Sequence, residues 1–215
     1  MSGETHCPLC AGPEISAYFQ DKRRPYLSCG DCSLVFVPPQ AYLGRTDERA
    51  EYDLHQNDIH DPGYRNFLSR LVRPLVKRIP AGARGLDFGC GPGPALAHML
   101  RDAGYEVLVY DSFYVPDRSV LQGSYDFICA TEVVEHLHQP GKELAQLWSL
   151  LPPGGLLALM TKLVRDPVAF ASWHYKNDPT HVCFFSANTW RWWAAQQDAS
   201  LEIIGADVIL LAKQA

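Results

Sequence analysis

Residues 84–93, Arg-Gly-Leu-Asp-Phe-Gly-Cys-Gly-Pro-Gly, constrain the fold of this chain more than any other segment. Residues 85–88 are apolar except for Asp87 and predict a strand. Three glycines then stand at every second position: Gly89, Gly91 and Gly93. A periodic apolar run from Pro94 predicts a helix directly afterwards. Glycine tolerates positive φ and close approach of a ligand, and a helix N-terminus offers unbonded N–H groups, so we expect this turn to bind a nucleotide-like cofactor.

The rest of the chain after this turn alternates predicted strands and helices. We expect strands at 106–110, 125–130, 156–160, 201–204 and 207–212, and helices at 94–103, 142–151 and 187–199. This alternation favours an α/β fold with a doubly wound sheet, and the last two strands favour a closing hairpin. We assign residues 81–215 to this main domain.

Two smaller segments precede the main domain. Residues 41–80 are interpreted as a linker and a helix, because apolar residues recur at helical spacing over 63–79. Pro74 lies inside that helix and predicts either a kink or a restart. Residues 1–40 are expected to form a small unit with short strands at 15–20 and 25–28.

Four cysteines in this small unit form the strongest metal-binding pattern in the chain: Cys7, Cys10, Cys29 and Cys32. They make two Cys-x-x-Cys pairs separated by eighteen residues, a spacing typical of zinc ribbons. Four thiolates complete a tetrahedral zinc site and leave no open ligand position, so we expect a structural zinc ion. Two disulfides or four unrelated thiols are the alternatives.

Composition limits the classes of function. The 215 residues are 47% hydrophobic and carry a net charge of -5, which fits a globular protein and not a polyanion-binding one. Residues 1–50 hold five Lys/Arg and six Asp/Glu, so the ribbon lacks the basic charge that nucleic-acid binding requires. We find neither an apolar run long enough to span a membrane nor a secretion signal at 1–6, and expect a cytoplasmic protein. The sequence carries no indication of oligomeric state.

Two residues beside the glycine turn narrow the class of cofactor. Dinucleotide-binding turns carry a third glycine where this chain has Pro94. The carboxylate of Asp87 would repel a pyrophosphate, whereas it suits a cofactor with a cationic group.

Four segments in order resemble motifs of the class I S-adenosylmethionine-dependent methyltransferases. They are residues 86–93 for the first motif, 109–111 for the acidic end of the second strand, 125–137 for the fourth strand, and 151–157 for the turn into the fifth strand. The four-cysteine ribbon and residues 178–182 further resemble a bacterial branch of zinc-ribbon methyltransferases. The resemblance implies a Rossmann-like sheet with S-adenosylmethionine as cofactor. The cofactor-binding residues that it implies are Asp87, Gly89, Cys90, Gly91, Gly93, Asp111, Ser112, Thr131 and Glu132.

The chain departs from this family after Asp111. Only thirteen residues separate Asp111 from Tyr125, too few for a full crossover helix and a third strand. We therefore expect helix two, strand three or both to be reduced, with Phe113 or Tyr114 near the adenine.

The sulfonium makes the methyl group electrophilic, so the protein mainly has to align the acceptor and remove its proton. Glu135, His136 and His181 are the candidate catalytic residues, as bases or orienting groups. A helix-start role for His136 and an ordinary loop role for His181 stay open as alternatives.

The leading hypothesis is methyl transfer to a small-molecule acceptor through oxygen, nitrogen or carbon. The alternatives are an rRNA or tRNA methyltransferase that grips RNA with the ribbon, a non-catalytic cofactor-binding protein, and a dinucleotide-dependent oxidoreductase. The chain lacks the Asn/Asp-Pro-Pro-Tyr/Phe tetrapeptide of base-amino methyltransferases after the fourth strand, which argues against the RNA hypothesis.

Overall fold

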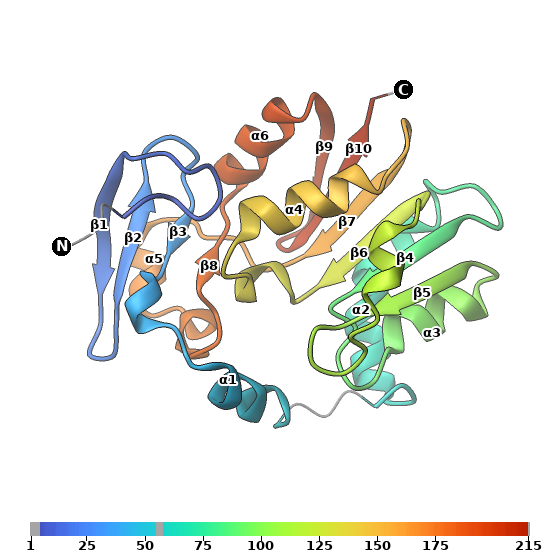
Figure 1. Cartoon of the computed structure of the whole chain (residues 1–215), viewed down its shortest axis with the longest axis horizontal. Helices are drawn as coiled ribbons and strands as arrows, with labels where there is room; N and C mark the ends of the chain where they lie inside the picture. The colour runs from blue at the N-terminus through green and yellow to red at the C-terminus, as the bar shows by residue number, and fades with distance from the viewer. Residues whose placement is uncertain (1–4, 55–57, 215) are drawn as a thin grey trace.

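The computed structural model describes residues 5–54 and 58–214 (Figure 1). The first four residues, on which the expectation about secretion partly rests, lie outside the described residues. Within the described ranges, no helix has the length and apolar character needed to cross a membrane.

The central sheet has six strands in the order β5-β4-β6-β7-β10-β9. Their bounds are β4 Arg84–Phe88, β5 Glu106–Tyr110, β6 Phe127–Thr131, β7 Leu156–Met160, β9 Ala199–Ile204 and β10 Val208–Lys213. Strands β5, β4, β6 and β7 are parallel, whereas β10 lies antiparallel between β7 and β9. The predicted doubly wound sheet and closing hairpin are confirmed, and the carboxyl ends of β4, β5 and β6 meet at one edge.

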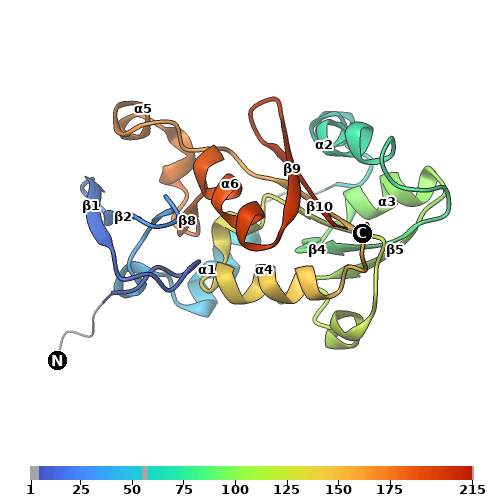
Figure 2. The same cartoon turned by 90° about the horizontal axis from the view of Figure 1, so that it is seen from above.

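Helices cover both faces of this sheet (Figure 2). One face carries α2 (Pro62–Leu75) and α3 (Ala95–Asp102), and the other carries α4 (Pro140–Ser149) and α6 (Ala187–Gln196). Trp148 of α4 meets Trp193 of α6 edge-on with ring centroids 5.1 Å apart. The core therefore has two halves, one on each side of the sheet.

The helix predicted over 63–79 forms, but its predicted end is wrong because the helix ends earlier. Helix α2 stops at Leu75, and the N–H groups of Arg78 and Ile79 both bond to the carbonyl of Leu75 in turns. Pro74 lies in the last turn of the helix, and among the described residues no second helix starts between Leu75 and β4.

The segment between β5 and β6 is reduced, as predicted. It contains one bridge between Asp111 and Val115 and the 3-10 helix η2 (Arg118–Gln122). Among the described residues, no strand pairs with the outer edge of β5. This part of the chain therefore contributes no third strand, and β5 ends the sheet.

A second sheet holds the N-terminal ribbon, drawn in blue in Figure 1. Its strands are β1 Ile15–Gln20, β2 Pro25–Cys29, β3 Val35–Phe36 and β8 Cys183–Phe184, in that order. The sequence did not indicate β8, which comes from the main part of the chain and pairs with β3. Main-chain hydrogen bonds therefore join the ribbon to the segment that precedes α6.

The ribbon also lies against the first turn of α4. The N–H of Gly141 donates to the carbonyl of Pro8 at 3.2 Å. A Cβ at position 141 would lie 2.2 Å from the carbonyl oxygen of Leu9, so only glycine permits this approach.

Candidate active site

A cavity of about 770 Å³ opens at the carboxyl ends of β4, β5 and β6. Its wall includes the glycine turn, the segment after β5, the segment after β6 and α1 (Arg45–Tyr52). Ten of the twelve predicted binding and catalytic residues outside the ribbon line it: Asp87, Gly89, Cys90, Gly91, Asp111, Ser112, Thr131, Glu132, His136 and His181. Gly93 and Glu135 are absent from the described lining residues.

The glycine turn has the conformation that its sequence indicates. Gly89 and Gly91 have φ values of 73° and 64°, in the left-handed region. The N–H of Gly89 donates to the carbonyl of Tyr110 at 2.7 Å, which fixes the turn against β5. A Cβ on Gly89 would lie 2.4 Å from a methyl carbon of Val133, so the turn also packs closely on the segment after β6.

Asp87 faces the cavity from the end of β4 and is almost fully buried, at 2% exposure. Its Oδ2 accepts a hydrogen bond from the N–H of Ala97 in α3 at 3.2 Å. Burial raises the pKa of Asp87 to about 7, although that N–H and Arg101 partly oppose the shift. The carboxylate therefore links the sheet to α3 in addition to facing the cavity.

Asp111 ties the glycine turn to the segment after β5. Its Oδ2 accepts from the N–H of Gly91 at 3.0 Å. Its Oδ1 accepts from the N–H groups of Phe113 and Tyr114, at 2.8 and 3.1 Å. The short loop is therefore organised around one carboxylate, and both of these aromatic residues line the cavity.

Helix α1 supplies cavity residues that the sequence did not reveal. The guanidinium of Arg45 lies over the ring of Phe113, 4.4 Å from its centroid. Tyr52 packs edge-on against Phe113 and His136, with ring centroids 5.5 and 5.2 Å away. The aromatic and charged composition of residues 42–52 is the one signal for such a role, and it fits a linker equally well.

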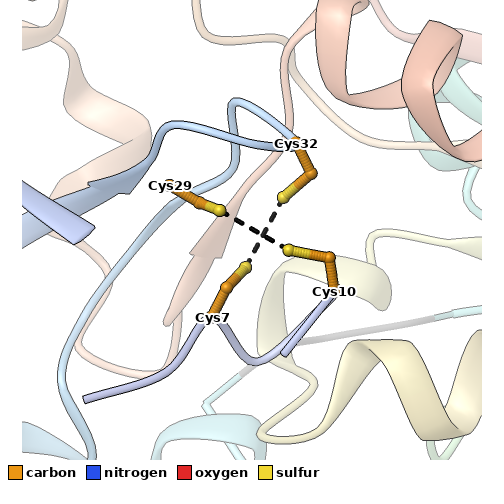
Figure 3. A group of neighbouring side chains, drawn as sticks. All are labelled: Cys7, Cys10, Cys29 and Cys32. Atoms are coloured by element: carbon orange, nitrogen blue, oxygen red, sulfur yellow. Dashed lines mark hydrogen bonds between the residues drawn. The ribbon is translucent and has the colours of Figure 1, made fainter. Parts of the chain in front are cut away.

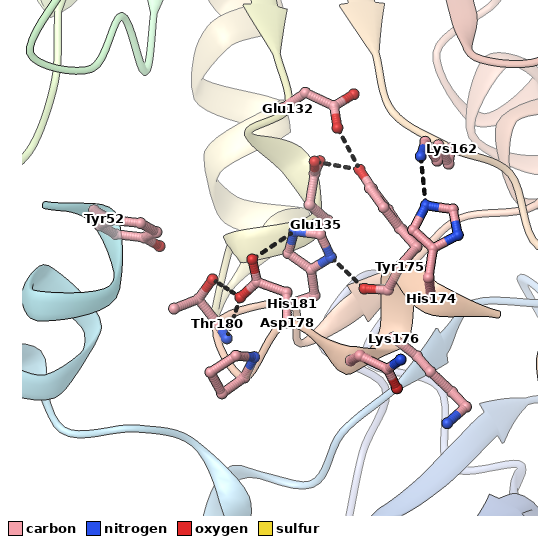
Figure 4. A network of polar contacts seen from close by, with 12 residues as sticks. Tyr52, Glu132, Glu135, Lys162, His174, Tyr175, Lys176, Asp178, Thr180 and His181 are labelled. Carbon is pink, nitrogen blue, oxygen red and sulfur yellow. Dashed lines mark hydrogen bonds and ion pairs between the residues drawn. The ribbon is translucent and has the colours of Figure 1, made fainter. Parts of the chain in front are cut away.

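A buried polar network lies beside the end of β6 (Figure 4). The hydroxyl of Tyr175 lies within hydrogen-bonding distance of Glu132 Oε2, at 3.3 Å, and of Glu135 Oε1. Burial raises the pKa of both glutamates, and the charge of Glu132 adds to the shift at Glu135. Glu132 also has φ of 53°, a conformation that non-glycine residues rarely adopt, and such strain is common at functional sites.

His181 joins this network from the loop after the 3-10 helix η4 (His174–Asn177). Its Nδ1 donates to the carbonyl oxygen of Tyr175 at 2.7 Å, because a carbonyl can only accept. Its Nε2 lies 3.7 Å from Asp178 Oδ2, and its ring lies 4.6 Å from that of His136. The fold thus gathers Glu135, His136 and His181 in one place, with the two histidines on the cavity side.

The ribbon holds the loop that carries Asp178 and His181. Arg24 is buried and donates to the backbone carbonyls of three loop residues, at 2.8 to 3.0 Å: Lys176, Asp178 and Pro179. Lys176 in turn pairs with Asp21 of the ribbon at 3.2 Å. The position of His181 therefore depends on contacts with residues 21–26.

The four predicted metal ligands come together at the other end of the ribbon (Figure 3). Their sulfur atoms all lie within 4.8 Å of one another, and Cys7–Cys32 and Cys10–Cys29 are each 3.5 Å apart. All four cysteines are free thiols, so the disulfide alternative is not supported. The other three cysteines, Cys90, Cys129 and Cys183, are buried, as small apolar residues often are.

Comparison with known proteins identifies the family. A model of the family described as "Methyltransferase domain" matches residues 61–203, which include strands β4, β5, β6 and β7 of the central sheet and most of β9. The chain belongs to this methyltransferase domain family.

Curated relatives of this methyltransferase-family chain match it over part of its length. A ubiquinone biosynthesis O-methyltransferase of Xanthomonas axonopodis pv. citri is 36% identical over 126 residues, covering 47% of this chain and 52% of that protein. A trans-aconitate 2-methyltransferase of Deinococcus radiodurans is 28% identical over 120 residues, covering 47% and 46%. The chain spans about half the length of the curated relatives it matches.

Solved structures share the fold. Magnesium protoporphyrin IX methyltransferase of Synechocystis, solved with bound S-adenosylhomocysteine, gives a TM-score of 0.53 at 18% identity over 79% of this chain and 94% of that one. The YcgJ protein of Bacillus subtilis gives 0.50 at 14% identity, over 68% and 99%. At these identities the likeness supports the fold alone.

Proposed function

We propose that this protein is an S-adenosylmethionine-dependent methyltransferase that acts on a small-molecule acceptor and releases S-adenosylhomocysteine. The observation that carries the proposal is the glycine turn, which follows Asp87, bonds to Asp111 through Gly91 and lines one large cavity. The names of the curated relatives, which include ubiquinone biosynthesis O-methyltransferase and trans-aconitate 2-methyltransferase, support a small-molecule acceptor.

The cofactor would lie along the edge of the sheet formed by β4, β5 and β6. In this proposal Asp87 faces the ammonium group of the methionine part, and the backbone of Gly89 to Gly91 follows the cofactor. Asp111 and Ser112 face the ribose, while Phe113 and Tyr114 flank the adenine in place of a third strand. Thr131 and Glu132 line the cavity beyond the methionine part.

The acceptor would enter between the segment after β6 and α1. We name Glu135, His136 and His181 the acceptor-activating cluster, because two of its members line the cavity and the third lies directly behind them. In the reaction, the acceptor atom forms a bond to the methyl carbon and the carbon–sulfur bond breaks. Its electron pair stays on sulfur as a neutral thioether, and the proton of the acceptor must be removed.

The four cysteines are proposed to hold one structural zinc ion. Tetrahedral coordination with zinc–sulfur bonds of about 2.3 Å places the sulfurs about 3.8 Å apart, which fits the observed cluster. The ion would stabilise the ribbon, which in turn supports the loop of His181 through Arg24. We keep the division into residues 1–40, 41–80 and 81–215 as a proposal, with the addition that β8 pairs with the ribbon.

Calorimetric titration with S-adenosylhomocysteine tests the proposed function. We expect saturable binding with a stoichiometry of about one per chain, and no binding of NAD. Binding of NAD in place of S-adenosylhomocysteine would overturn the proposal. If S-adenosylhomocysteine binds, incubation with a labelled methyl donor and a mixture of small phenols and carboxylic acids then tests for transfer; a cofactor complex without any transfer would favour the non-catalytic alternative.

A further inference from the structure

We propose that the acceptor-activating cluster, Glu135, His136 and His181, binds a divalent cation at the acceptor end of the cavity. This would be a second metal site, separate from the four cysteines in position and in chemistry. The binding part of the proposal stands independently, and its catalytic part rests on the proposed function.

The geometry of the three side chains fits a metal ion. One carboxylate oxygen of Glu135 and one ring nitrogen of each histidine all lie within 4.8 Å of one another. The fold brings them together from two separate segments, the turn after β6 and the loop before β8. Two imidazoles and a carboxylate are a ligand set that suits zinc and other first-row divalent ions, and a set of three protein ligands leaves a position open.

The neighbouring hydrogen bonds orient two of the ligands. His181 donates its Nδ1–H to the carbonyl of Tyr175 at 2.7 Å, which leaves Nε2 as the ring nitrogen that a metal ion would bind in place of a proton. The hydroxyl of Tyr175 bonds to Oε1 of Glu135 (Figure 4). Metal-binding histidines and carboxylates are usually held in this manner by a second layer of hydrogen bonds, and here one residue, Tyr175, contacts both.

An independent observation is the state of the second oxygen of Glu135. Glu135 is fully buried, and its Oε2 accepts no hydrogen bond from any described residue. A buried carboxylate oxygen without a partner is costly, so it marks a position where a cation would be stabilising. Asp178 Oδ2, 3.7 Å from His181 Nε2, adds a second carboxylate to the same place. Either a metal ion or a proton on His181 Nε2 would stabilise these facing groups.

Such a cation would lie at the cavity wall, because His136 and His181 both line the cavity. A hydroxyl or enol oxygen of the acceptor bound to it would lose its proton to water at neutral pH, since a divalent ion lowers the pKa of an oxygen ligand. The oxygen anion then takes the methyl carbon while the carbon–sulfur electron pair returns to sulfur. The proposed site therefore favours an acceptor that bears an acidic oxygen, such as a phenol or an enol.

Metal stoichiometry in the full-length protein tests the site. After saturation with Zn²⁺ and gel filtration, we expect about two zinc ions per wild-type chain and about one in Glu135→Gln and in His181→Gln. Glutamine keeps the approximate size of each side chain, and at position 135 it can keep the bond to Tyr175. His174→Gln is the matched control, because His174 lies on the same loop, is exposed and bonds to Lys162 instead; it should keep both ions.

Titration of Zn²⁺ into protein that already holds one ion should show binding of a second ion to the wild type. In the two variants the affinity for this second ion should be at least tenfold weaker. A wild-type protein that retains only one ion, held by the cysteines, would overturn the proposal and indicate that a proton on His181 supplies the charge. Equal retention of a second ion by all variants would also overturn it. Binding of S-adenosylhomocysteine, measured on the same samples, shows that the variants are folded. It also separates this proposal from the proposed function, because the protein could bind the cofactor without a second zinc ion, or bind a second zinc ion without the cofactor.

Discussion

The guanidinium of Arg24 donates a hydrogen bond of 2.8 Å to the backbone carbonyl of Asp178, and this contact joins the ribbon to the cavity. The two residues are separated by 154 positions in the chain. The carboxylate of Asp178 faces His181, so the ribbon positions a loop whose side chains line the cavity.

Arg24→Lys should destabilise the protein by about 2–4 kcal/mol, because lysine cannot reach three carbonyls in a fixed fork and leaves buried acceptors without donors. Urea denaturation measures this change. Arg23→Lys is the control, since Arg23 is exposed and bonds to Asn177 at the surface; it should cost less than about 1 kcal/mol. Equal effects of the two substitutions would contradict the positioning role of Arg24.

Loss of the proposed ribbon zinc should lower the proposed methyl transfer more than cofactor binding. Cys10→Ser is expected to lose the proposed zinc ion and to lower the melting temperature by about 10 °C, as loss of several kcal/mol would do in a chain of this size. The glycine turn lies on the central sheet and not on the ribbon, so affinity for S-adenosylhomocysteine should change less than about tenfold, which is about 1.4 kcal/mol. Calorimetry and a methyl-transfer assay on the same sample separate the two effects; full activity without the metal would show that the ribbon has no such role.

Cofactor affinity should depend on pH through Asp87. The pKa of Asp87 is raised to about 7 by burial, so the carboxylate is progressively protonated below that pH. An ammonium group prefers the ionised form, and affinity should therefore fall by up to about tenfold for each pH unit below 7. Calorimetric titration across this range measures the change. Asp87→Asn keeps an acceptor for the N–H of Ala97 but should bind weakly at all pH values, with little pH dependence.

The stability of the cofactor-free protein should change with pH in the opposite direction to cofactor affinity. A folded pKa above the ordinary value of 3.8 means that the folded state binds a proton more tightly than the unfolded state. The contribution of Asp87 thus destabilises the fold above pH 7, and stability is regained as the pH falls from about 8 towards 4. Urea midpoints of wild type and Asp87→Asn across this range should converge at low pH; parallel curves would mean that Asp87 has an ordinary pKa.

Gly89→Ala should destabilise the protein by about 2–4 kcal/mol, because it combines an unfavourable backbone conformation with steric overlap. The new Cβ would lie 2.4 Å from the side chain of Val133. Gly104→Ala is the matched control, since Gly104 has φ of 90° but a Cβ added there would meet no atom within 4 Å; only the backbone strain, about 1 kcal/mol, should remain. Urea denaturation of both variants measures the difference, and similar losses would show that contact with Val133 is unimportant.

Much of the fold follows from local patterns. The alternation of strands and helices, the glycine turn and the reduced segment after Asp111 were all visible in the sequence, because each depends on residues close together in the chain. The end of α2 was predicted poorly, since apolar spacing continues to Ile79 while the residues after Leu75 form turns and not a continued helix.

The site was only partly accessible from the sequence. Residues at the ends of β4, β5 and β6 could be assigned, because parallel strands bring their carboxyl ends to one edge. The contribution of α1 could not, since its polar surface gives no sign of which cavity it closes. Glu135 was expected beside the acceptor, yet it lies behind the histidines, where Tyr175 bonds to it.

The sequence by itself determined the order of the strands in the central sheet along the chain, the glycine turn and the four-cysteine pattern, because spacing along the chain is enough to specify each of them. Only the tertiary structure decided that β8 completes the ribbon sheet, that Arg24 supports the loop of His181, and that His181 meets Glu135. These contacts join residues more than forty positions apart and depend on packing around the central sheet. Local periodicity predicts which side of a helix or strand is apolar, but it does not predict which distant segment will cover that side.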